Sequence, residues 1–418
     1  MEQSISIKSE NHKNTQNLPV KIGVPLVCLR KHEPVTDDGA SRASKKIIVN
    51  SQDGVINGKP CPQENRIIRY QRQSASRRLL SDKRVSKCLR WRIGKVQVLK
   101  SVEFNKCHYG NLTICGSVWD CPVCASKIAE VRRLELTLAT KQHISLGGSV
   151  LLVTLTYPHQ REDDLSVLLS RQSKAMQWFY RHRDYKDLKK RYMKKGRVRA
   201  LEVNHGEANG WHPHIHELWF MDMHLSDFET LHLEVLTLWR KACVKHGLGV
   251  PSFEHGVDIK GGDYAAKYVT KFGQEDKKDW SIEHELTKSN VKKGRKGSRS
   301  PFQLLDDYIE GDKRAGALFI EYSQAFKGKR QLTWSRGLKA QFELEEKSDD
   351  EIAHEQEDTA ILLAEIETDE WRAIIGTSTP KQDNRALVLT LAENGGVDVM
   401  RRFISDLVIR YKKLINVT

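Results

Sequence analysis

Three histidines at alternate positions, His212, His214 and His216, have the spacing best suited to metal chemistry in this 418-residue chain. Side chains alternate along a β-strand, so His214 and His216 should lie on one face, about 7 Å apart. Two imidazoles at that spacing can converge on one divalent cation if a third ligand is present. The alternative is that the histidines only pack a sheet, and His212, at the end of a loop, could serve merely to fix the turn.

The third ligand can be predicted from the register of a hairpin. A loop rich in Gly and Asn, His205–Trp211, precedes the histidine strand. If the turn is centred near Ala208, Glu202 lies directly opposite His214 on the same face. Two histidines and a carboxylate would leave coordination positions open for a phosphate oxygen or water, so the cation could act as a Lewis acid.

A second group of reactive side chains lies in the run Tyr264-Ala-Ala-Lys267-Tyr268-Val-Thr-Lys271. On a helix, Tyr264 and Tyr268 share one face, Lys267 and Lys271 form a second such pair, and Asp263 can cap the first turn. A free phenol, with a pKa near 10, is a poor nucleophile. A polarised phosphate and a nearby ammonium would make its attack feasible. An amphipathic helix that buries its aromatic side chains would give the same pattern.

Four of the eight cysteines cluster between Cys107 and Cys124. Cys121 and Cys124 form a close chelating pair, and Cys107 and Cys115 could complete a tetrahedral thiolate site for a structural Zn²⁺. His108 is an alternative ligand. The cysteines could also be small buried residues of a reduced protein.

The charge of the chain favours a polyanionic partner. It carries 69 Lys and Arg against 54 Asp and Glu, a formal net charge of +15. Eight basic residues fall within Lys186–Arg199, with Tyr185 and Tyr192 beside or among them, which suits a single-stranded nucleic acid whose bases stack on aromatic rings. The residues expected to contact DNA there are Lys189, Lys190, Arg191, Lys194, Lys195 and Arg197. No signal peptide and no membrane-spanning run is evident, so the protein is expected in the cytoplasm.

The elements that position these residues follow from hydrophobic periodicity. The predicted strands are Val150–Tyr157, Val198–Asn204, His212–Met221 and Phe253–Ile259, and the predicted helices are Leu165–Arg183, Leu225–His246 and Tyr264–Phe272. The order β-α-β-β-α-β predicts an α+β fold with a ferredoxin-like or RRM-like antiparallel sheet. Two helices would cover one face and leave the other free for a site. A further helix, with Ile128, Val131, Leu134 and Leu138 as its apolar face, precedes the first of these strands.

The two histidine and tyrosine motifs together resemble those of the His-hydrophobic-His (HUH) endonucleases, specifically the rolling-circle replication initiators of small bacterial plasmids and single-stranded DNA phages. Val153-Thr-Leu-Thr156 is similar to the family's first motif, His214 and His216 match its paired metal ligands, and Tyr268 matches its nucleophile. Many plasmid members carry a glutamate four residues before that tyrosine. Tyr264 stands there instead, as in the two-tyrosine phage initiators.

The resemblance spans roughly Cys88–Leu338 and implies a nickase and strand transferase that uses Mg²⁺ or Mn²⁺. Such an enzyme leaves a 5′-phosphotyrosine and a 3′-hydroxyl primer on replication-origin DNA, bound as a single strand or a hairpin. A host helicase and a polymerase are expected partners, in a bacterial cytoplasm, and the oligomeric state stays open. The alternatives are an HUH transposase, a zinc-containing DNA-binding regulator without catalysis, and a zinc hydrolase of a small substrate.

The expected organisation has five parts. They are a flexible polar and basic region at 1–80, a Cys-rich zinc-binding segment at 81–145, the nuclease domain at 146–340, an acidic connector at 341–378 and a helical C-terminal domain at 379–418. The connector is expected to be solvated and helical, because thirteen acidic residues and one Lys fall within Glu343–Glu370.

Overall fold

The computed structural model describes residues 55–56, 59–60, 62–102, 104–261, 297–355 and 359–416. Arg66–Thr418 form one compact unit, and the short antiparallel pair β1 (Val55–Ile56) and β2 (Lys59–Pro60) belongs to the part before it. The helix predicted at Tyr264–Phe272 lies outside the described residues, and with it Tyr264, Lys267, Tyr268 and Lys271. None of the described helices is both long and apolar enough to cross a membrane.

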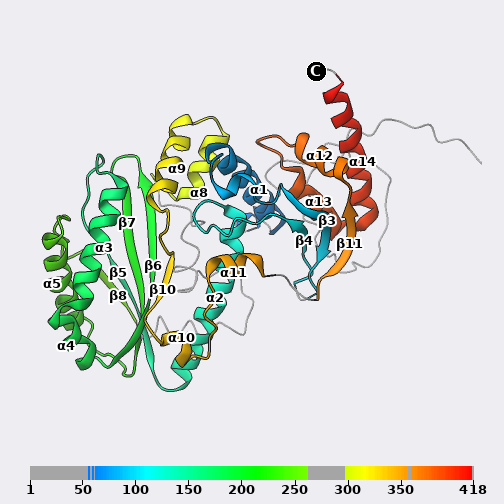
Figure 1. The fold of residues 1–418 in the computed structure, drawn as a ribbon. Helices are drawn as coiled ribbons and strands as arrows, with labels where there is room; N and C mark the ends of the chain where they lie inside the picture. Colours follow the sequence, from blue (N-terminus) through cyan, green and yellow to red (C-terminus); the bar gives the residue numbers. More distant parts are fainter. Residues whose placement is uncertain are drawn as a thin grey trace, which may run out of the picture. The chain divides into compact units, whose positions relative to one another are not determined.

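The larger sheet is antiparallel, with the strand order β10-β6-β7-β5-β8 (Figure 1). Its strands are β5 (Ser149–Leu155), β6 (Lys194–Gly206), β7 (Gly210–Met221), β8 (Val257–Lys260) and β10 (Leu332–Trp334), and β9 (Ser298–Arg299) pairs with the end of β6. The predicted order β-α-β-β-α-β is found along the chain from β5 to β8, with one short helix that was not predicted, at Arg183–Arg191, before β6. Strands β6 and β7 are longer than predicted, because their pairing continues to Gly206 and Gly210 at the turn and because β6 already pairs with β7 from Lys194.

One face of this sheet is covered by α3 (Leu165–Arg181) and α5 (Glu229–Lys245), with α4 (Arg183–Arg191) beside them (Figure 1). Asp164 caps α3 by accepting a hydrogen bond from the backbone N–H of Val167. The core beneath contains large apolar side chains, among them Leu168, Met176, Phe179, Trp219 and Trp239. The first predicted helix ends two residues early, because the backbone turns to an extended conformation at His182 before α4 begins.

The opposite face is not free along its whole length, which corrects the expectation from the sequence. Helices α2 (Pro122–Ser145) and α10 (Leu338–Gln341) cover one end of it, where Leu218 and Phe220 of β7 are buried. His214 and His216 occupy the same face at the other end, because they are separated from Leu218 by even numbers of residues. This face therefore has an apolar end and a polar end.

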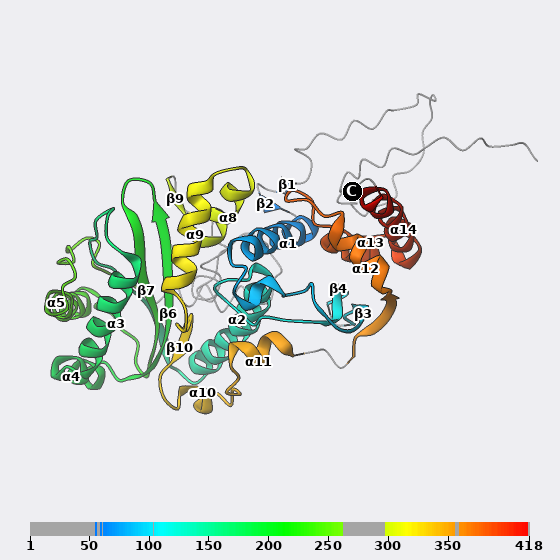
Figure 2. The ribbon, with the colours of Figure 1, turned by 45° about the horizontal axis from the view of Figure 1, so that its top comes forward.

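Helix α2 reaches from the thiol-rich region to the larger sheet (Figure 2). Its first half contributes Ile128 to one core, and its second half contributes Leu136 and Ala139 to another. The predicted apolar face is wrong in part, because Leu134 and Leu138 are exposed. The two halves of α2 pack against different cores, so different sets of its side chains are buried along its length.

A smaller sheet has the order β11-β3-β4 and is also antiparallel. Its strands are β3 (Arg92–Lys100), β4 (Cys107–Leu112) and β11 (Ile361–Ile366). The remaining described helices are α1 (Pro62–Leu79), the short 3-10 turn η1 (Arg84–Ser86), α8 (Pro301–Ile309), α9 (Lys313–Ala325), α11 (Asp349–His354), α12 (Thr368–Gly376), α13 (Asn384–Asn394) and α14 (Gly396–Ile415).

The acidic segment differs from the solvated helical connector that was expected. It contains the helices α11 and α12, but β11 lies between them and pairs with β3. Ala364 and Ile366 of β11 are buried, so alternation outweighs the acidic composition there. The C-terminal helices are also tied to the rest of this unit: the guanidinium of Arg385, fully buried, donates to the carboxylate of Asp383 and to the backbone oxygen of Leu89.

Candidate metal centres and nucleic-acid surface

The β6–β7 hairpin has the register predicted from the sequence. Glu202 pairs with His214 and Ala200 with His216, across a turn at 207–209. The turn closes through Gly210, whose φ of +70° favours glycine. A Cβ there would also lie 2.6 Å from the backbone oxygen of Arg161. The main chain therefore holds the carboxylate and the imidazoles on one face.

Glu202, His214 and His216 form a compact, buried group of potential metal ligands. The Glu202 Oε2 atom lies 3.2 Å from His214 Nε2 and 3.5 Å from His216 Nε2. One ligand atom from each of the three residues lies within 4.8 Å of the others. All three predicted ligands are thus brought together.

Hydrogen bonds on the outer side of both imidazoles orient them. His216 Nδ1 lies 2.9 Å from Thr154 Oγ1 of β5, and His214 Nδ1 lies 3.2 Å from the backbone oxygen of His212. If each Nδ1–H donates in these contacts, each Nε2 presents a lone pair toward Glu202, which is the tautomer that metal binding requires.

The carboxylate of Glu202 fits a cation in this position. Burial alone raises its pKa, but when the imidazoles are protonated the charge of His216 and hydrogen bonds from His214 and His216 outweigh that effect and lower the pKa to about 2. A bound cation would supply the same positive charge next to neutral imidazoles. Among the described residues, none donates a hydrogen bond to the buried Oε1 atom. An ionised, buried carboxylate with a bare oxygen suits a divalent cation.

His212, the doubtful ligand of the sequence prediction, is not part of this group. Its Nδ1 atom lies 2.7 Å from Nε2 of His159, a residue that the sequence analysis did not select. Burial, with smaller effects of His214 and His159, lowers the pKa of His212 to about 3. His159 could have been found from its position four residues after the end of β5, the strand next to β7.

A second group of potential ligands consists of four buried thiols, those of Cys88, Cys115, Cys121 and Cys124. Three of the predicted cysteines are present, but Cys107 is not, and Cys88 takes its place. Cys107 begins β4, and the strand carries it about 17 Å from the end at which Cys115 follows. Its backbone N–H donates to Glu393 Oε1 instead. His108, the alternative ligand, is also outside the group.

Two residues expected to contact DNA are engaged inside the protein. Lys194 is buried, donates to the hydroxyl of Tyr185 at 2.9 Å, and lies 3.0 Å above the ring of Trp219. Arg197 contacts the buried carboxylate of Glu217 at 3.1 Å. Both charged groups lie against side chains of α3 and α4, so neither is presented to a phosphate backbone, although Lys194 also contributes to the wall of the hollow described next. The sequence of a basic run does not show which of its side chains point outward and which point inward to a buried carboxylate.

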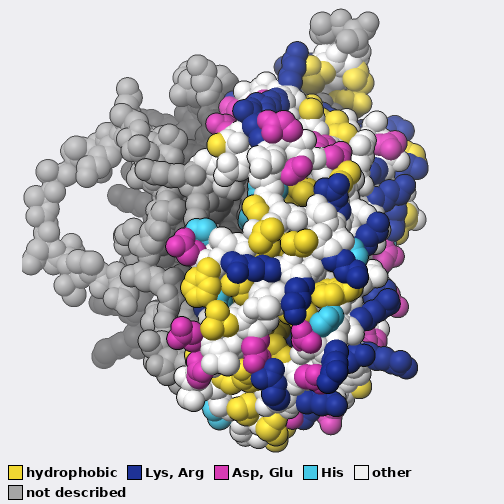
Figure 3. Space-filling model, turned by 90° about the vertical axis from the view of Figure 1, so that its left-hand side faces the viewer, with side chains coloured by type: hydrophobic (Ala, Val, Ile, Leu, Met, Phe, Trp, Pro, Cys, Tyr) yellow, Lys and Arg dark blue, Asp and Glu magenta, His cyan; other side chains and the backbone are white. Residues whose placement is uncertain are grey.

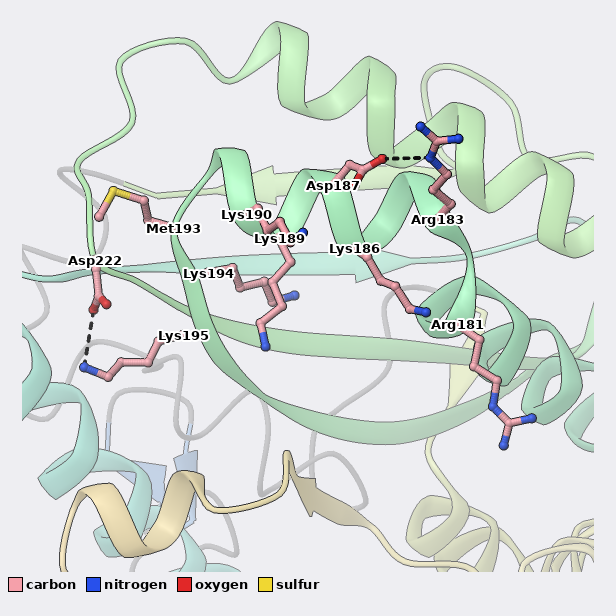
Figure 4. A pocket seen from close by; sticks show the side chains of 10 residues that line it. All are labelled: Arg181, Arg183, Lys186, Asp187, Lys189, Lys190, Met193, Lys194, Lys195 and Asp222. Atoms are coloured by element: carbon pink, nitrogen blue, oxygen red, sulfur yellow. Dashed lines mark ion pairs between the residues drawn. The ribbon is translucent and has the colours of Figure 1, made fainter.

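Lys186, Lys189, Lys190 and Lys195 of this segment, together with Lys194, line an open hollow of about 760 Å³ at the far end of the sheet. Lys and Arg side chains are exposed over the face formed by α3, α4 and α5 (Figure 3). Figure 4 shows the hollow, which is lined by Arg181, Arg183, Lys186, Asp187, Lys189, Lys190, Met193, Lys194, Lys195 and Asp222. Arg191, the remaining predicted contact, instead pairs with Glu234 at 2.7 Å.

The protein thus has an α+β fold with two buried groups of potential metal ligands and a basic hollow. The chain belongs to the replication protein family (Rep_1), which matches residues 108–385. The matched region contains the β6–β7 hairpin and three of the four clustered thiols.

Two curated proteins are similar to parts of the chain. Protein rep of Streptomyces lividans is 29% identical over 289 residues, which are 54% of this chain and 62% of that protein. The neomycin resistance protein of Streptomyces cyanogenus is 31% identical over 128 residues, which are 25% of this chain and 29% of that protein. The chain thus matches less than two thirds of the length of either relative. No solved structure matches it.

Proposed function

We propose that this protein initiates rolling-circle replication of a plasmid by nicking one strand of origin DNA with a tyrosine. The observation that carries the proposal is the buried group of Glu202, His214 and His216, built on one hairpin in a member of the replication protein family. Two histidines on alternate positions of one strand are the signature motif of the HUH endonucleases that the sequence resembles.

The larger sheet supports the same assignment. Strands β6, β7, β5 and β8 lie in that order, all antiparallel, with α3 and α5 on one face. This arrangement is compatible with a ferredoxin-like or RRM-like sheet in which β5 and β7 are central. The candidate ligands lie on the face away from α3 and α5, at the end that α2 and α10 leave uncovered.

The cation proposed for this group is Mg²⁺ or Mn²⁺, which would polarise the scissile phosphate. Glu202, His214 and His216 would hold it, and Thr154 and the backbone oxygen of His212 would keep the imidazoles in the required tautomer.

Tyr268 is the proposed nucleophile. Its phenolate oxygen forms a bond to phosphorus, the bond from phosphorus to the 3′ oxygen breaks, and that oxygen takes a proton to become the primer hydroxyl. Lys267 or Lys271 would stabilise the developing charge. Tyr264 would attack the regenerated junction after one round, and the free 3′-hydroxyl would close the circle. These four assignments rest on the resemblance in sequence.

The basic hollow is the proposed contact for the backbone of origin DNA at a distance from the nick. Lys195 precedes Glu202 by seven residues on β6, which corresponds to about 24 Å along the strand. Lys186, Lys189 and Lys190 of α4 lie at the same end. A polyanion that contacts both the basic hollow and the candidate metal group would run along the length of the sheet. Recruitment of a host helicase and a polymerase would come after the nick.

A covalent-adduct assay tests this function. The full chain is incubated with Mn²⁺ and single-stranded oligonucleotides tiled over its replicon, and the products are separated on denaturing gels. One oligonucleotide should give a protein–DNA adduct, which Tyr268→Phe and Glu202→Gln should abolish and Tyr411→Phe, on the C-terminal helix, should retain. An adduct in Tyr268→Phe that disappears in Tyr264→Phe would move the nucleophile to Tyr264.

The same assay separates the alternatives. A DNA-binding regulator without catalysis would bind the origin without a cation and leave supercoiled plasmid intact. A transposase would form the adduct on the ends of a mobile element, and the replicon would be maintained without the gene.

A further inference from the structure

The four clustered thiols have the spacing of ligands around a single ion. The Sγ atom of Cys88 lies 3.8 Å from that of Cys121 and 3.7 Å from that of Cys124, and the Sγ atoms of Cys115 and Cys124 are 3.7 Å apart. A tetrahedron with Zn–S bonds of about 2.3 Å has edges of about 3.8 Å. A disulfide would need sulphur atoms about 2.0 Å apart.

Three separate segments bring these thiols together. The base of the β3–β4 hairpin joins Cys88 and Cys115, because the N–H of Leu89 donates to the oxygen of Thr113 at 2.7 Å and the N–H of Thr113 donates to the oxygen of Trp91 at 2.8 Å. Cys121 and Cys124 come from the start of α2, as its N-cap and first turn. A turn follows Cys115 at Gly116, whose φ is +62°.

The surroundings favour a thiolate at Cys121. The backbone N–H of Cys124 and the side-chain amide of Gln73 in α1 both point at the sulphur of Cys121, at 3.5 Å and 3.6 Å. The amino end of α2 carries a partial positive charge next to Cys121 and Cys124. All four side chains are buried, so thiolates there need a cation to balance them.

We infer that Cys88, Cys115, Cys121 and Cys124 bind one Zn²⁺ as a closed, four-coordinate structural centre. The ion joins the β3–β4 hairpin to the first turn of α2. The second half of that helix packs on the face of the larger sheet that carries His214 and His216, so the ion anchors a helix that supports the candidate site. The role is structural, because four protein ligands leave no open position.

Metal analysis of the full chain tests this inference independently of nicking. The His214→Ala/His216→Ala variant is the background, so that of the two ligand groups found in the described part of the chain only the thiol group can retain an ion. After purification under reducing conditions and dialysis, it should contain one zinc per chain. Cys88→Ser should lower the zinc content at least tenfold, whereas Cys107→Ser, the matched buried cysteine outside the group, should leave it unchanged.

Replacement of the ion by Co²⁺ gives a second readout. A tetrathiolate centre should show sulphur-to-cobalt charge-transfer absorption. Cys88→His should keep one ion with a weaker charge-transfer band, because three thiolates and one imidazole also form a zinc site. That variant separates loss of a ligand from failure to fold. The inference is overturned if Cys107→Ser loses the zinc while Cys88→Ser retains it, if iron replaces zinc, or if the background protein holds no ion.

Discussion

Strand β5 contacts the candidate metal group through Thr154, whose hydroxyl forms a hydrogen bond with Nδ1 of His216. Thr154→Val removes that partner but keeps the shape of the side chain. We expect the affinity for Mn²⁺ to fall by roughly 10- to 100-fold, because partners of ligating histidines fix their tautomer and orientation. The measurement is the Mn²⁺ concentration for half-maximal adduct formation.

Thr156→Val is the matched control for this prediction. Thr156 follows directly after the end of β5, two residues beyond Thr154, and its hydroxyl donates to the backbone oxygen of His255 and not to a histidine ring. The control should keep the Mn²⁺ requirement of the original protein. Equal Mn²⁺ requirements for both variants would mean that Thr154 does not position His216.

The residues of the two metal groups show what sequence could and could not predict. Glu202 was found because a short turn fixes the register of a hairpin, and that register places it opposite His214. Cys88 was missed because it lies 27 residues before Cys115 and is brought there by the β3–β4 hairpin, which the sequence analysis did not recognise. The sequence analysis chose Cys107 instead, because it lies closer to Cys115 along the chain.

At the scale of elements, α2 is the helix whose packing can be tested most directly. Leu136 is fully buried against the larger sheet, whereas Leu138 is 59% exposed. Leu136→Ala should lower the free energy of unfolding by about 2–5 kcal/mol, through reduced burial and the cavity left behind. Leu138→Ala should change it by less than about 0.5 kcal/mol. Denaturant unfolding of both variants provides the comparison, and similar losses would contradict the packing of α2 against the sheet.

His143, near the end of α2, should make stability depend on pH. Burial lowers its pKa below the usual value of about 6.5, and its Nε2 atom lies 2.9 Å from the backbone oxygen of Met221. The unfolded chain takes up a proton as the pH falls through about 6.5, and the folded chain does not. The contribution of His143 is therefore complete above that pH and is lost as the pH falls below it.

The measurement is the thermal midpoint between pH 7.5 and 5.5. His143→Gln should show a smaller decrease over this range than the original protein, whose other buried histidines are common to both. An unchanged pH dependence in the variant would show that His143 does not titrate in this way.

The order of β5, α3, β6, β7, α5 and β8 was predictable because each of these strands and helices has a clear period, whereas α4, β9 and β10 were not predicted. The packing of the second face of the larger sheet was not predictable, because α2 lies before the first strand and α10 follows β10. Likewise, the acidic composition of 343–370 concealed β11, whose inward residues alternate with Glu365. Composition describes the exposed side of an element better than the buried side.

At the scale of the whole molecule, the positive charge should make DNA binding depend on salt. Lys186→Ala, Lys189→Ala and Lys190→Ala together remove three ammonium groups from the hollow. The slope of log affinity against log salt should become shallower by about 0.7 for each phosphate of a single strand that the protein no longer neutralises. Fluorescence anisotropy with an origin oligonucleotide at several salt concentrations measures it.

Asp187→Asn changes the charge of the same hollow in the opposite direction. This substitution removes a carboxylate that contacts Arg183 at 3.5 Å. It should raise the affinity at low salt and leave adduct formation with the nicked oligonucleotide intact. If neither change alters the slope, DNA does not run through the hollow.

The tight turn of the β6–β7 hairpin has a consequence for the gene. One extra codon between those for Glu202 and Gly206 would keep the reading frame but turn the carboxylate to the face covered by α3 and α5, because side chains alternate along a strand. The same codon added at 207–209 would only lengthen the turn. In a library of single-codon insertions selected for plasmid maintenance, survivors should map to the turn and be absent from the two flanking strand segments.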